Sequence, residues 1–128
     1  MSSLCKVSFD ENDGVAKVVM SGKATHEEHL AARDEASRIC KEKNCSKLMV
    51  DLSNLDTEYS STMDCFSFGT SFADKLPYVQ IAYVLPKENK SASDVWFTTT
   101  VQKNRGVNCK EFKNIEEAGK WLLEKNNL

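Results

Sequence analysis

The chain has 128 residues, of which 41% are hydrophobic and 28% are charged, and its net charge is -2. This length and composition are typical of one globular domain. The near-neutral charge, without a Lys/Arg-rich run, argues against nucleic acid as a partner, and apolar runs of about five residues are too short for a transmembrane helix of roughly 20.

The first predicted element is an antiparallel hairpin. Apolar and polar residues alternate over residues 5–10, which is the period-2 pattern of a half-buried strand. Residues 15–20 are rich in β-branched side chains and predict a second strand. The turn between the two strands ends at Gly14, which can adopt positive φ.

A helix is predicted next, from Thr25 to about residue 43. Thr25 and Glu28 have the spacing of a capping box, in which each side chain accepts a hydrogen bond from the other residue's amide. Asn44 is a candidate left-handed cap. An apolar line at helical spacing predicts the buried side of this helix: Ala32, Ala36, Ile39 and Cys40.

Strands and helices then alternate. Residues 47–52 predict a central strand, residues 60–75 an aromatic helix that Pro77 ends, and residues 79–85 an apolar strand covered on both faces. A helix at 92–104 has Ser91 and Ser93 as candidate caps and should pack through Trp96, Phe97, Thr100 and Val101. A strand at 107–112 and a helix capped by Asn114 complete the chain, with Ile115, Ala118 and Leu122 as the packing residues.

The resulting order is β-β-α-β-α-β-α-β-α. Strict alternation after the hairpin implies parallel strands joined by right-handed crossovers. The sequence therefore predicts a single α/β domain over residues 1–128, with a mixed five-stranded sheet, an N-terminal antiparallel hairpin and four helices.

Two motifs add a family resemblance. Asp51-Leu52-Ser53 ends the central strand and Tyr59-Ser60-Ser61-Thr62-Met63 opens the next helix, while Glu116-Glu117-Ala118 and Trp121-Leu122 stand near the C-terminus. With the element order, these residues resemble the STAS domain. The resemblance is greatest to stand-alone bacterial SpoIIAA-like proteins (anti-sigma-factor antagonists), a group related to lipid-binding CRAL-TRIO domains.

The resemblance implies a regulatory phospho-acceptor at Ser60, with Ser61 beside it. The family has aspartate before the serine pair and glycine after it, where this chain has Tyr59 and Thr62. The alternative is that one serine is simply the helix N-cap. We favour the cap, because the acidic residues Asp56, Glu58 and Asp64 crowd the same corner and would repel a phosphate.

The aromatic helix is the candidate ligand or partner surface. Its three phenylalanines cannot easily all face one core. Exposed members would mark a dimer surface or an apolar groove, while the alternative is a helix buried on two sides. The surface residues proposed on this basis are Tyr59, Thr62, Met63, Phe66, Phe68 and Phe72.

Metal binding and catalysis are not expected. About 21 Å of helix separates His26 from Cys40, too far for a shared metal site with His29 and Cys45. The five cysteines have no regular spacing and predict free thiols. Asp51 is expected to accept loop amides rather than a phosphoryl group, and no nucleophile motif occurs.

Two function classes remain open. The first is a non-catalytic regulatory module that binds a regulatory protein or a second copy of itself. The second is a carrier-like domain that binds an apolar small molecule or lipid near residues 60–75. No cofactor is expected in either case. The N-terminal residues 1–6 lack the apolar core of a signal peptide, so we expect a cytoplasmic protein.

Overall fold

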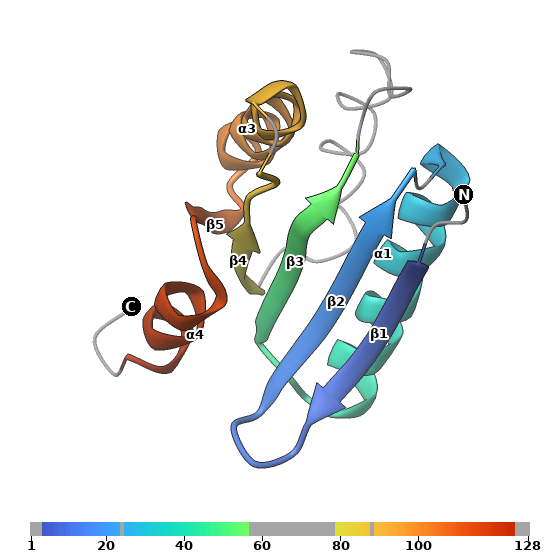
Figure 1. Ribbon diagram of the computed structural model, residues 1–128. Helices are drawn as coiled ribbons and strands as arrows, with labels where there is room; N and C mark the ends of the chain where they lie inside the picture. The colour runs from blue at the N-terminus through green and yellow to red at the C-terminus, as the bar shows by residue number, and fades with distance from the viewer. Residues whose placement is uncertain (1–3, 24, 57–78, 88, 125–128) are drawn as a thin grey trace.

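The computed structural model describes residues 4–23, 25–56, 79–87 and 89–124, which form a five-stranded sheet with three helices (Figure 1). The strands are β1 (Leu4–Asp10), β2 (Val15–Gly22), β3 (Lys47–Leu55), β4 (Gln80–Val84) and β5 (Asn108–Phe112). The helices are α1 (His26–Glu42), α3 (Asn89–Asn104) and α4 (Ile115–Leu123).

The strands lie in the sheet in chain order, β1-β2-β3-β4-β5. β1 and β2 form an antiparallel hairpin whose turn contains Gly14 at φ 71, and each later pair is parallel. The predicted mixed sheet, its hairpin and the inner positions of β3 and β4 are confirmed. The predicted helix at residues 60–75 lies outside the described residues.

Helices cover both faces of the sheet, with α4 on the viewer's side and α1 behind it (Figure 1). On one face, Ala36 of α1 and Val95 of α3 belong to the core cluster that contains Ile81 of β4. On the other face, Leu122 of α4 packs in a second cluster with Ala82 of β4. Successive residues of β4 therefore enter opposite cores, which is why the strand has almost no polar residue after Gln80.

Both ends of α1 have the predicted caps. The Thr25 hydroxyl accepts a hydrogen bond from the Glu28 amide at 3.1 Å, and the Thr25 amide donates to the Glu28 carboxylate at 2.9 Å. At the other end, Asn44 adopts φ 53. The Cys45 amide donates to the Cys40 carbonyl at 2.8 Å and the Asn44 amide to the Lys41 carbonyl at 3.4 Å. This pair of bonds is a Schellman motif.

Removing the N-terminal cap has a measurable consequence. Thr25→Ala is expected to lower the free energy of unfolding by about 1 kcal/mol, because the Glu28 amide loses its acceptor. Urea denaturation of Thr25→Ala and Thr25→Ser provides the measurement. Serine keeps the hydroxyl, so Thr25→Ser should lie close to wild type; equal losses in both variants would contradict a role for the capping bond.

The other helices differ from the sequence prediction. α3 begins at Asn89, so Ser91 and Ser93 lie within it and are not its caps. The first turn of a surface helix needs no apolar residue, so the polar sequence there resembled a loop. In α4, the Asn114 cap is confirmed by its hydrogen bond from the Glu117 amide. Ile115 is exposed, not packed as predicted, because burial in α4 begins one turn later.

None of the helices within the described ranges combines the length and hydropathy needed to cross a membrane.

Candidate functional site

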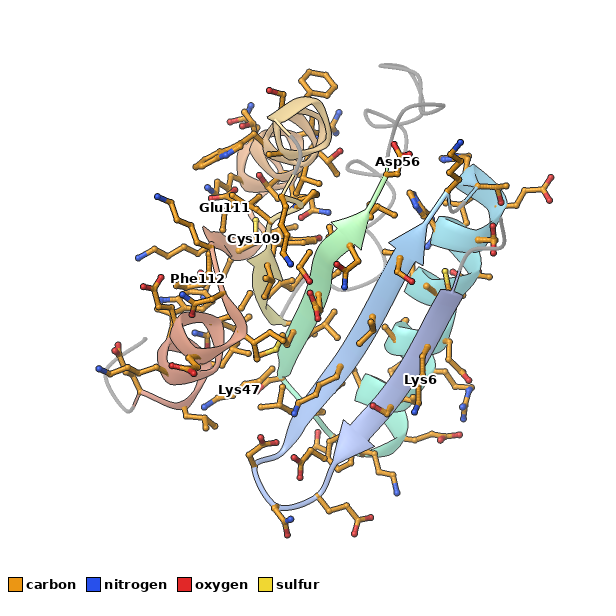
Figure 2. All side chains as sticks on the ribbon, in the orientation of Figure 1. Lys6, Lys47, Asp56, Cys109, Glu111 and Phe112 are labelled. Carbon is orange, nitrogen blue, oxygen red and sulfur yellow. The ribbon has the colours of Figure 1, made fainter. Side chains whose placement is uncertain are left out.

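All the site residues predicted from the sequence lie outside the described part of the chain: Tyr59, Ser60, Ser61, Thr62, Met63, Phe66, Phe68 and Phe72. The structure describes β3, the strand that leads toward them, and the residue after it, Asp56 (Figure 2). The Asp56 amide donates to the Gly22 carbonyl at 2.9 Å, which fixes the end of β3 beside the end of β2.

The Asp51-Leu52-Ser53 motif forms a local bend within β3 and does not end the strand. The Asp51 carboxylate accepts from the Ser53 amide at 3.0 Å and from the Ser53 hydroxyl at 2.7 Å. Asp51 thus accepts a backbone amide, as predicted, but the amide belongs to β3 and not to a loop. Val19 pairs with Asp51 and Ser21 with Asn54, so β3 contains one extra residue, a β-bulge.

The bulge changes which side chains of β3 face the core. Leu52 and Leu55 are three residues apart, yet both are buried in the same core cluster. Regular strand alternation would place them on opposite faces. The extra residue shifts the alternation by one position, so Leu55 faces the same core as Leu52. The strand continues to Leu55, three residues beyond the predicted end.

The outer side of α3 is the exposed aromatic surface of the described structure. Trp96 is 48% exposed and Phe97 is 39% exposed, and Thr100 beside them is also exposed. The prediction that these three residues pack in the core is wrong, while the predicted packing of Val101 is confirmed. We call Trp96 and Phe97 the α3 aromatic pair.

The inner side of α3 carries buried polar residues beside its valines, which explains the error. Thr99 and Gln102 are fully buried, on the same side as Val95. The Tyr83 hydroxyl of β4 donates to the Gln102 side-chain oxygen at 2.9 Å, which satisfies the acceptor of this buried amide, whereas the amide nitrogen has no hydrogen-bond partner among the described residues. Polar residues thus occupy the core side, and the aromatic residues face outward.

A salt bridge also fastens α3 to β5. The Lys103 ammonium lies 2.9 and 3.0 Å from the two carboxylate oxygens of Glu111, whose side chain is only 3% exposed. Glu111 and Cys109 lie on β5 (Figure 2). The Lys103 ammonium is also 5.6 Å from the centroid of the Trp96 ring, within cation–π range. The aromatic pair is therefore displayed by a helix with several fixed attachments.

Two buried groups beneath α3, the Tyr83 hydroxyl and the Cys109 thiol, stay neutral near pH 7. Burial raises the pKa of Tyr83 well above its ordinary value. Burial likewise raises the pKa of Cys109 to about 12, so its sulfur remains a protonated thiol rather than the reactive thiolate. The arrangement around α3 thus favours attachment and display over nucleophilic chemistry.

The inner attachments of α3 were not predicted from the sequence. Tyr83 lies in a strand with few polar residues. Gln102 lies seven residues after Val95, a spacing that places both residues on the same side of a helix. A tyrosine in a buried strand and a glutamine on the core side of a helix form a complementary polar pair. That complementarity is the signal that could have located them.

The histidines and cysteines discussed for metal binding also have definite positions. His26 and His29 lie in the first turns of α1 and are half-buried, whereas Cys40 lies in its last turns and Cys45 follows the helix. Within the described ranges, no three His, Cys, Asp or Glu side chains are grouped as metal ligands. Cys5, Cys40, Cys45 and Cys109 are free, and Cys65 lies outside those ranges.

Comparison with known proteins gives a likeness of fold alone. No family model matches the chain, and no curated protein does. Among solved structures, the chain is similar to the NMR structure of the protein TM1081, with a TM-score of 0.55 and 17% sequence identity. The similarity covers 93% of this chain and 88% of that one, so it extends over nearly the whole domain.

Proposed function

We propose that the protein is a STAS-like, non-catalytic regulatory module that binds another protein through the α3 aromatic pair. The observation that carries this proposal is the exposure of Trp96 and Phe97 on a helix anchored from beneath. Aromatic side chains, tryptophan above all, are enriched among the residues that dominate binding energy at protein interfaces. A fixed helix also loses little conformational entropy on binding.

The charges beside α3 indicate what kind of partner fits. Lys87 precedes the helix and Arg105 follows it, and both are exposed. Complementary charge across an interface orients the partner and raises the association rate. The partner expected is therefore a protein with an apolar pocket for the aromatic pair and carboxylates on either side of it.

The STAS resemblance supports a regulatory role but assigns the phospho-acceptor to Ser60, in the segment beyond β3. The proposal therefore also concerns whether phosphorylation of Ser60 regulates partner binding. If phosphorylation regulates binding, Ser60→Asp weakens partner binding while Ser60→Ala preserves it, with little change in stability. If Ser60 is a helix cap, Ser60→Asp is nearly neutral and Ser60→Ala costs about 1 kcal/mol.

Binding is tested by comparing variants as bait. The immobilised full chain is exposed to extract of its own host, and retained proteins are quantified by mass spectrometry. Trp96→Ala/Phe97→Ala should reduce the specific partner by about tenfold or more, the loss typical of a removed binding hot spot. The matched control is Ile115→Ala/Leu123→Ala, which removes two exposed apolar side chains from α4 instead.

The control should retain the partner at the wild-type level, and denaturation midpoints should show that both double variants are folded. Equal retention by both would contradict the assignment of the binding surface to α3. If the only specific prey is a second copy of this chain, the surface is a homodimer interface and the proposed regulatory partner is wrong.

A further inference from the structure

Two cysteines occupy the two positions that a Schellman motif brings together. Cys40 is three residues before the C-cap of α1, Lys43, and Cys45 is two residues after it. In this motif the side chains at these positions frequently make a hydrophobic contact. Here both side chains are thiols, with Cys40 in the core cluster on this face of the sheet and Cys45 packed against that cluster. The α1 C-terminus therefore carries two thiols at positions whose side chains this motif brings close together.

The backbone geometry meets the requirement for a disulfide. The Cys45 amide nitrogen lies 2.8 Å from the Cys40 carbonyl oxygen. Standard bond lengths then keep the two Cα atoms within about 6.7 Å, and disulfide-bonded cysteines usually have Cα atoms about 4.4–6.8 Å apart. The Cα separation thus allows a disulfide without unwinding of the helix end.

The two thiols differ in accessibility. Cys45 is half-buried, and its sulfur lies 3.1 Å from the Gly14 carbonyl oxygen and 3.0 Å from that of Lys47. Cys40 is buried, and burial, followed by electrostatic interaction with Cys45, raises the pKa of Cys40 to about 12. Cys45 is therefore the thiol that an oxidant reaches first, and Cys40 is positioned to react with it second.

We propose that Cys40 and Cys45 form a reversible redox pair that hydrogen peroxide converts to an intramolecular disulfide. The Cys45 sulfur attacks one peroxide oxygen, the O–O bond breaks, and Cys45 becomes a sulfenic acid as one water leaves. The Cys40 sulfur then attacks the Cys45 sulfur, the S–S bond forms, and the hydroxyl leaves as a second water with the Cys40 proton. The two thiols supply the two electrons that reduce the peroxide.

The reaction changes a junction of three elements. In the reduced state the Cys45 thiol donates toward the Gly14 carbonyl in the β1–β2 turn and the Lys47 carbonyl at the start of β3. A disulfide sulfur has no proton to donate. Oxidation thus removes the hydrogen bond that Cys45 makes at this junction and replaces it with a covalent link to α1.

The test uses the full chain, oxidised with hydrogen peroxide under native conditions, alkylated and digested with trypsin. Cleavage after Arg38, Lys41, Lys43 and Lys47 places the two cysteines in separate peptides, residues 39–41 and 44–47. These peptides should appear linked, with the loss of two hydrogen masses, and dithiothreitol should release them. In Cys40→Ala, Cys45 should instead accumulate as a sulfenic acid that dimedone traps; Cys109→Ala should still form the link.

The disulfide products of native wild-type protein are compared with those of wild-type protein oxidised in urea. This comparison does not require that any variant folds. The native protein should give the 39–41 to 44–47 link as its main product, whereas the unfolded chain should give mixed pairings. Native protein that yields no such link, or the same mixture as the unfolded chain, would overturn the proposal. Accumulation of Cys45 sulfinic acid in native wild-type protein would do the same, since Cys40 would have failed to react.

Discussion

Leu122→Ala is expected to lower the free energy of unfolding by about 3 kcal/mol, the usual loss when a buried leucine leaves a cavity. Leu122 is 0% exposed and packs in the cluster that joins α4 to β3 and β4 through Met49, Ala82 and Val84. Few side chains hold α4 to the sheet, so neighbouring residues cannot easily fill the space. Urea denaturation monitored by circular dichroism gives the free energy directly.

Leu123→Ala is the matched control. The two leucines are adjacent on one helix, and Leu123 is 49% exposed. Both substitutions change helix propensity equally, so any difference between them reports burial. Leu123→Ala should cost less than about 1 kcal/mol. Similar losses at the two positions would show that α4 does not pack on the sheet through Leu122.

Lys103→Met is the second substitution with a large expected effect, a loss of about 2 kcal/mol. The Glu111 side chain is only 3% exposed, and Lys103 is the ion-pair partner of its carboxylate. Methionine retains most of the apolar stem but leaves the Glu111 charge buried without compensation. The loss is smaller than that for a fully buried pair because Lys103 is 41% exposed, so water partly screens the interaction.

A double variant distinguishes lost pairing from lost packing. Lys103→Met/Glu111→Gln removes the charge together with its partner, so its free energy of unfolding should recover most of the loss. Lys113→Met, at an exposed lysine, should change stability by no more than about 0.5 kcal/mol. If Lys103→Met behaves like Lys113→Met, the buried carboxylate does not depend on Lys103.

Features with local causes could be predicted from the sequence. The Thr25 capping box and the left-handed Asn44 each depend on residues within a few positions, and both are confirmed. The strands of the sheet were also identifiable, because alternating or continuous apolar patterns report directly whether one face or both are covered. The core positions of α1 followed from helical spacing in the same way.

Features that depend on distant partners could not be predicted. Gln102 is buried with its side-chain oxygen bonded to the Tyr83 hydroxyl, 19 residues earlier in the chain. A prediction from hydrophobicity alone, which takes no account of that partner, places Trp96 and Phe97 in the core. The structure exposes both residues. The bulge in β3 likewise depends on the pairing with β2, so Asp51-Leu52-Ser53 resembled the end of a strand.

The order of the strands also has a consequence for how the chain folds as it is synthesised. Each strand pairs with the strand that precedes it in the sequence, so no strand must wait for a later one to occupy a gap in the sheet. The N-terminal hairpin, whose contacts are local, can form first, and β3, β4 and β5 can add successively to the growing edge. Each parallel pairing nevertheless joins residues 28 to 33 positions apart, so the addition of these strands is expected to be slower than formation of the hairpin and to limit the folding rate.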